Sequence, residues 1–140
     1  MSIETHSHDL VVLFEHPEWQ EPLFYALDRA DVDFDVVDLK AGTFNTRDLP
    51  SAPLYFNQAS PSAYVRGNAR AVPFALALME QIESRGIRVL NGSRAFRLEL
   101  SKLAQLSLLR DLGIAHPNTL AFNDIETLAE RANEIGFPLR

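Results

Sequence analysis

The feature that most constrains the fold is a run of five apolar residues, "LVVLF" (Leu10–Phe14), which follows a polar leader. Successive side chains of a β-strand point to opposite faces of its sheet, so a strand that is apolar at every position is buried on both faces. Strands of this kind are typical of parallel sheets that are covered by helices. The run therefore predicts an α/β fold.

The rest of the first 91 residues repeats this pattern. Further short strands are expected at Phe34–Leu39, Pro53–Asn57 and Ile87–Asn91. Apolar residues at helical spacing predict one helix over residues 18–30 and a second that carries the stripe Ala75–Ile82. The alternation predicts a Rossmann-like open, mainly parallel sheet of about four strands with helices on both faces. Residues 1–91 are expected to form this domain.

Composition excludes several classes of protein. The chain has no cysteine, which excludes disulfides and fits a cytoplasmic protein. Its net charge of −6 argues against binding to nucleic acid, which needs a basic surface. No apolar run approaches the length of about 18 residues that a membrane span needs, and the first residues do not resemble a signal peptide. His6, His8 and His16 lack a cysteine or a suitably spaced carboxylate, so no metal site is predicted.

A candidate binding site follows from the predicted sheet. Parallel sheets of this kind bind ligands beyond the carboxyl ends of their strands. Five side chains that can form hydrogen bonds follow these ends: Asn57, Ser60, Ser62, Arg66 and Asn91. Arg66 has two interpretations, because it could bind a substrate carboxylate or pair with one of the 19 acidic residues of the chain. No residue with a catalytic role, such as a nucleophilic serine in an elbow motif, is predicted.

The segment Leu100–Leu112 predicts a helix that is apolar on nearly every side. At about 100° per residue, its circumference is covered by Leu100, Leu103, Ala104, Leu106, Leu108, Leu109 and Leu112. Such a helix is normally buried all round. Lys102 lies among these leucines and either extends its amine to water or meets an anion such as a phosphate. A fifth strand is expected at Pro117–Asn123, followed by an amphipathic helix that begins near Ile125.

The second part of the chain resembles the entry into the ATP-grasp fold. The matching elements are the turn Asn91–Gly92, the pair Ser101–Lys102, the motif "LLRDLGIAHPNTL" (Leu108–Leu120) and "GFP" (Gly136–Pro138). The segment "LYFNQASPSAYVRGNARAV" (Leu54–Val72) is similar to the one that precedes them in these enzymes. In pattern, the chain most resembles the ligases related to the ribosomal protein S6 modification enzyme and to glutathione synthetase.

This resemblance implies a function. Such ligases use magnesium and ATP to phosphorylate a carboxylate, and an amine or thiol then displaces the phosphate. Lys102 would be the first of two lysines that contact the nucleotide. Residues 92–140 would be a linker helix and the beginning of the nucleotide-binding α+β domain. The chain is then expected to be an N-terminal fragment that supplies part of the cleft for a small-molecule or peptide carboxylate. By itself it would bind no cofactor tightly and catalyse nothing, and its main partner would be the rest of that domain.

Two other classes of function remain open. The chain could be a stand-alone α/β module that binds proteins through the leucine-rich helix, and that helix could also mediate self-association. A flavodoxin-like receiver or ligand-binding domain is less well supported, because the acidic cluster expected after its first strand is reduced to Glu15, Glu18 and Glu21. No G-x-G-x-x-G motif supports a dinucleotide site.

Overall fold

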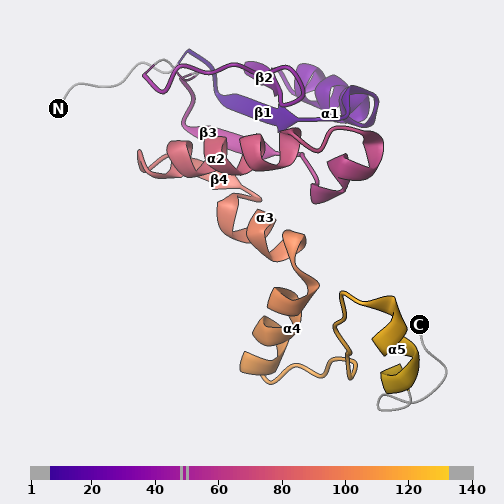
Figure 1. Ribbon diagram of the computed structural model, residues 1–140. Coiled ribbons are helices and arrows are strands. Elements are labelled where there is room, and N and C mark those ends of the chain that lie inside the picture. Colours follow the sequence, from indigo (N-terminus) through magenta and orange to yellow (C-terminus); the bar gives the residue numbers. More distant parts are fainter. Residues whose placement is uncertain (1–6, 48, 50, 133–140) are drawn as a thin grey trace. The chain divides into compact units, whose positions relative to one another are not determined.

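A computed structural model describes residues 7–47, 49 and 51–132 (Figure 1). Its helices and strands are, in chain order, β1 (Leu10–Phe14), α1 (Pro17–Arg29), β2 (Phe34–Asp38), β3 (Leu54–Asn57), the 3₁₀ helix η1 (Pro61–Arg66), α2 (Ala71–Glu83), β4 (Arg88–Leu90), α3 (Ser93–Leu100), α4 (Lys102–Asp111) and α5 (Ile125–Arg131). The predicted "GFP" motif and His6 lie outside the described residues.

The strands form one parallel sheet of four strands in the order β2-β1-β3-β4 (Figure 1). The strand β1 lies inside the sheet, where Val12 is paired with Val36 on one side and with Phe56 on the other. Every residue of β1 is buried, as its unbroken apolar sequence predicted. The predicted α/β fold with a parallel sheet is therefore confirmed.

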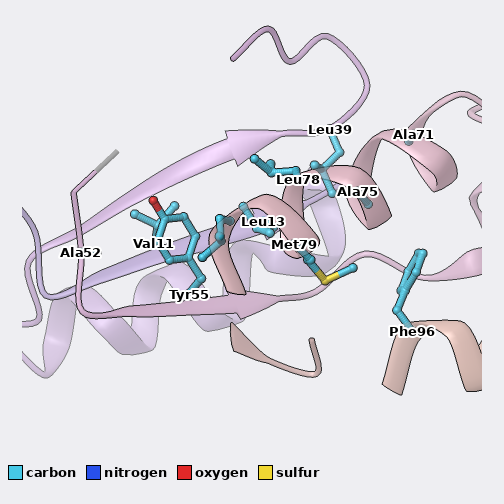
Figure 2. Packing of buried hydrophobic residues seen from close by; sticks show 11 residues of the cluster. Val11, Leu13, Leu39, Ala52, Tyr55, Ala71, Ala75, Leu78, Met79 and Phe96 are labelled. Atoms are coloured by element: carbon cyan, nitrogen blue, oxygen red, sulfur yellow. The ribbon is translucent and has the colours of Figure 1, made fainter. Parts of the chain in front are cut away.

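Helices cover both faces of this sheet. Val11 and Leu13 of β1 belong to the main hydrophobic cluster together with Leu78 of α2 (Figure 2). On the other face, the ring of Phe14 meets the ring of Phe24 in α1 edge-on, with 5.7 Å between the ring centroids. The alternation of side chains along β1 thus separates the residues that pack on α2 from those that pack on α1.

The chain divides into two compact units between Leu100 and Ser101. The helix α3 belongs to the first unit because Phe96, which is almost fully buried, joins the hydrophobic cluster of the sheet (Figure 2). The sequence suggested a boundary after Asn91. The helix α3, which follows that boundary, is anchored on the sheet by one aromatic side chain, and its short helical pattern does not reveal this contact.

The described part of the second unit contains α4 and α5. The helix α4 begins after Ser101, whose hydroxyl oxygen accepts a hydrogen bond from the backbone N–H of Ala104. The fifth strand predicted at Pro117–Asn123 is wrong, since these residues form neither strand nor helix. A strand needs a neighbouring strand for its backbone hydrogen bonds, and residues 101–132 contain no other strand.

Part of the leucine-rich surface of α4 is uncovered. No residue of α4 is buried; Leu103 in its first turn is 55% exposed, and Leu112, which directly follows the helix, is 63% exposed. Over the described residues, the chain has no helix with the length and apolar character needed to cross a membrane.

Candidate functional site

The candidate site begins where β3 and β4 end side by side. The side-chain amide of Asn57 donates a hydrogen bond to the backbone carbonyl of Asn91 over 3.1 Å, and the amide of Asn91 reaches the carbonyl of Asn57 at 3.4 Å. Asn91 has a φ of +53°, a left-handed conformation that asparagine adopts more readily than most residues. These reciprocal contacts fix the two strand ends against each other.

A cavity of about 150 Å³ opens beside these strand ends. It is lined by Asn57, Gln58, Ala59, Ser60, Asn91, Phe96 and Glu99. The structure therefore brings together three of the predicted site residues, Asn57, Ser60 and Asn91. Phe96 and Glu99 come from α3, which the sequence analysis did not place near the sheet.

A buried ion pair lies at the neighbouring strand end. Glu15 follows β1 directly, and its side chain is 1% exposed. The guanidinium of Arg66 donates hydrogen bonds to Glu15 from Nη2 over 2.5 Å and from Nε over 3.2 Å. The side-chain amide of Asn68 donates a further hydrogen bond to the same carboxylate. The structure thus pairs Arg66 with an acidic residue of the chain, which was one of its two interpretations.

The contacts of Glu15 set its protonation state. Burial raises the pKa of the Glu15 carboxyl, but the hydrogen bonds from Arg66 and Asn68 and the positive charge of Arg66 lower it. The lowering effects prevail, so the pKa of Glu15 lies below its ordinary value of 4.5. Glu15 is therefore a buried carboxylate that stays charged at neutral pH.

Hydrogen bonds connect this ion pair to the cavity. The Nη1 group of Arg66 donates to the Ser62 hydroxyl over 3.0 Å, and that hydroxyl lies 2.9 Å from the hydroxyl of Ser60, which lines the cavity. On its other side, the guanidinium lies 4.8 Å from the centroid of the exposed Trp19 ring. Ser62 and Arg66 therefore support the edge of the cavity, whereas Ser60 faces it.

Lys102 belongs to the second unit. It is the first residue of α4, is exposed, and its ammonium donates a hydrogen bond to the side chain of Gln105 over 3.2 Å. Residues 7–47, 49 and 51–132 contain no group of three or more histidine, cysteine or carboxylate side chains placed to hold a metal ion.

Sequence reasoning did not assign Glu15, Gln58, Phe96 or Glu99 to the site. Glu15 gave a signal, because a charged residue that directly follows a fully apolar central strand lies at the carboxyl rim. Glu99 lies three residues after the buried Phe96, on the same side of α3, so the packing of Phe96 determines where Glu99 lies.

Comparison with known proteins gives a match to solved structures. No protein-family model matches the chain, and neither does any curated protein. The ATP-grasp ligase PsnB, solved with the precursor peptide PsnA2 and AMPPNP, superposes with a TM-score of 0.59 at 17% identity. This chain shares its fold with part of an ATP-grasp ligase. The match covers 95% of this chain and 54% of PsnB.

Two further structures of the same ligase agree. PsnB with a minimal precursor, magnesium and ADP has a TM-score of 0.62 at 18% identity, covering 97% of this chain and 53% of PsnB. PsnB with the minimal precursor has a TM-score of 0.63 at 20% identity, and the match covers 93% of this chain and 51% of PsnB. The chain spans about half the length of the ligase it resembles. The predicted likeness to ATP-grasp enzymes is thus confirmed at the level of the fold.

Proposed function

We propose that this chain is part of an ATP-dependent ligase that joins a carboxylate to an amine or a thiol. The observation that carries the proposal is the shared fold with PsnB, a ligase solved with nucleotide, magnesium and a precursor peptide. The ATP-grasp motifs of residues 91–140 support it independently. Within these ligases, we propose a relationship to the ribosomal protein S6 modification enzyme and to glutathione synthetase.

The chemistry of such a ligase has two steps. An oxygen of the substrate carboxylate attacks the γ-phosphorus of ATP, ADP leaves, and an acyl phosphate forms. The amine nitrogen or thiol sulfur then attacks the carbonyl carbon, the C–O bond to phosphate breaks, and the nucleophile loses a proton. Separating one difficult substitution into two easier ones is the general advantage of an activated intermediate.

The two parts of the chain would then have different roles. Residues 1–91 would correspond to the substrate-side domain, in which the cavity lined by Asn57, Ser60 and Asn91 would face a substrate, and Ser62 and Arg66 would hold the edge of that cavity. Residues 92–140 correspond to the linker helix and the beginning of the nucleotide-binding domain. The rest of that domain would be the chain's partner, and the substrate would be a small-molecule or peptide carboxylate.

Lys102 would bind a phosphate group of ATP. A lysine ammonium is a flexible point charge that suits a phosphate, and its position after the capped start of α4 leaves it exposed. Magnesium would neutralise charge on the nucleotide phosphates. The part of the chain that the structure describes offers no cluster of three or more histidine, cysteine or carboxylate side chains to hold it.

The proposal can be tested on the protein expressed from its whole reading frame. Replacement of Lys102 by alanine should weaken ATP binding, measured by calorimetry, by about tenfold or more, because a hydrogen bond to a charged group is lost. The matched control is Lys40→Ala, which removes the other lysine of the chain. Unchanged ATP affinity in Lys102→Ala, or an equal loss in both variants, would contradict the role of Lys102. The absence of any ATP binding would contradict the proposed function.

A second candidate function follows from the exposure of α4. A module that binds another protein, or a second copy of itself, through Leu103 and Leu112 would explain why these side chains are uncovered. Chromatography coupled to light scattering separates the two proposals. A monomer that binds ATP favours the ligase, whereas a dimer that dissociates on Leu103→Lys and binds no ATP favours the interaction module.

A further inference from the structure

The cavity beside β3 and β4 has a definite charge. Among the residues that line it, Glu99 is the only one with a charged side chain, and the others are polar or apolar. Arg66, which holds Ser62 next to the cavity residue Ser60, is directed to Glu15 and Ser62 instead. The cavity therefore offers one carboxylate, which is exposed to solvent, and no lysine or arginine among its lining residues.

Most of the polar groups around the cavity already have partners. The Asn57 amide donates to Asn91 and its oxygen accepts from Ala59, and the Ser60 hydroxyl lies against Ser62. Gln58 and Glu99 differ from these. Within the part of the chain that the structure describes, the side chains of Gln58 and Glu99 have no hydrogen bond or ion pair. The two lie on different elements and line the same cavity.

We propose that this cavity binds the ammonium end of a primary amine. An ammonium group is a donor of three hydrogen bonds and accepts none, so it needs several acceptors. The cavity supplies two that have no partner within the described residues, the carboxylate of Glu99 and the side-chain oxygen of Gln58. A carboxylate ligand would meet the negative charge of Glu99 without a compensating cation.

The size of the cavity limits the ligand. A volume of about 150 Å³ has room for an amine on a short alkyl chain, such as the end of a lysine side chain. This inference rests on the proposed function, in which an amine is the acceptor. It specifies which of the two substrates this cavity binds, namely the amine and not the carboxylate.

The test uses the ¹⁵N-labelled 140-residue chain without nucleotide, titrated with n-propylamine hydrochloride or sodium propionate and followed by NMR. Propylamine should shift the amide signals of the lining residues Gln58, Asn91 and Phe96, with weak, saturable binding. Propionate should not change the chemical shifts of these amides. Glu99→Gln should weaken propylamine binding by about threefold or more, as expected for the loss of a partly exposed ion pair.

A matched control removes the same charge elsewhere. Glu21→Gln lies on α1, which does not line the cavity, and should bind propylamine as the parent chain does. Spectra of both variants without ligand show whether the fold is kept, and Gln58→Ala provides a second variant if Glu99→Gln is unfolded. Saturable shifts by propionate, shifts spread over the whole acidic surface, or equal binding by Glu99→Gln and the parent chain would each overturn the proposal. The titration contains no ATP, so a chain that does not bind propylamine could still be part of a ligase. Conversely, a chain that does not bind ATP could still bind propylamine, so the two proposals fail separately.

Discussion

At the scale of single residues, the contact between Glu15 and Arg66 connects the stability of the sheet to the geometry of the site. Glu15 is buried at the end of the central strand, where an uncompensated charge would be costly. Arg66 supplies the compensating charge and also holds Ser62, whose hydroxyl lies against the cavity residue Ser60. A change at Arg66 should therefore affect both folding and the shape of the site.

Replacement of Arg66 by methionine should lower the free energy of unfolding at pH 7 by about 3 kcal/mol, because the buried charge of Glu15 loses its partner. In the parent chain the pKa of Glu15 is lowered, so its contribution to stability is complete above the ordinary pKa of 4.5 and is lost as the pH falls through the lower, folded-state pKa. In Arg66→Met, the hydrogen bonds and charge of Arg66 no longer lower that pKa, so burial raises it relative to the parent chain. The difference in the free energy of unfolding between Arg66→Met and the parent chain should therefore become smaller in acid, where Glu15 becomes protonated.

Urea denaturation of both proteins between pH 7 and pH 4 measures this difference. The double variant Arg66→Met with Glu15→Gln is the control, because it removes the buried charge and should recover part of the lost stability at neutral pH. If Arg66→Met lowered the free energy of unfolding by the same amount at every pH, Arg66 would stabilise the fold through packing alone. The ion pair with Glu15 would then not be the source of the stability.

The sequence predicted some residues of the site and not others, for a geometric reason. Asn57 and Asn91 end neighbouring parallel strands, and their position at the rim follows from the strand pattern. The partner of Arg66 could not be predicted, because Glu15 lies 51 residues away and the choice depends on the path of the loop. The position of Glu99 depends on how α3 is rotated on the sheet, which Phe96 fixes.

At the scale of elements, the leucine-rich segment is divided at Ser101. The sequence predicted one helix from Leu100, but α3 ends at Leu100 and α4 begins at Lys102, with Ser101 in an extended conformation between them. The Ser101 hydroxyl then caps α4. The strand predicted near Pro117 failed for a related reason, because a local pattern does not show whether a neighbouring strand exists to complete its hydrogen bonds.

Ser101→Ala should destabilise the first turn of α4 by about 1 kcal/mol, the usual effect of removing a serine N-cap. Amide hydrogen exchange should therefore be faster at Ala104, whose N–H loses its side-chain acceptor. The control is Ser107→Ala in the middle of the same helix, where an exposed serine is replaced by a better helix former and exchange should be unchanged or slower. Faster exchange of the Ala104 amide in the Ser107→Ala control, or an unchanged exchange rate in Ser101→Ala, would contradict the capping role.

At the scale of the whole molecule, the hydrophobic cluster identifies the part that should fold by itself. Its fully buried members run from Val11 to Phe96, and none lies in the second unit (Figure 2). Tyr55 of β3 and Leu78 of α2 are among its largest members. The sequence predicted this core from its strand and helix patterns, apart from the contribution of α3. The first unit should therefore be independent of residues beyond Leu100, provided that α3 is kept.

This prediction can be tested by shortening the chain. A variant that ends at Leu100 should unfold cooperatively and keep the dispersed amide signals of β1 and β3. A variant that ends at Leu90 keeps all four strands but loses Phe96, whose removal from a core typically costs about 3–5 kcal/mol. It should unfold at a lower urea concentration or fail to fold. Equal stability of the two variants would show that α3 is not part of the first unit, and loss of folding in the longer one would show that the sheet needs the second unit.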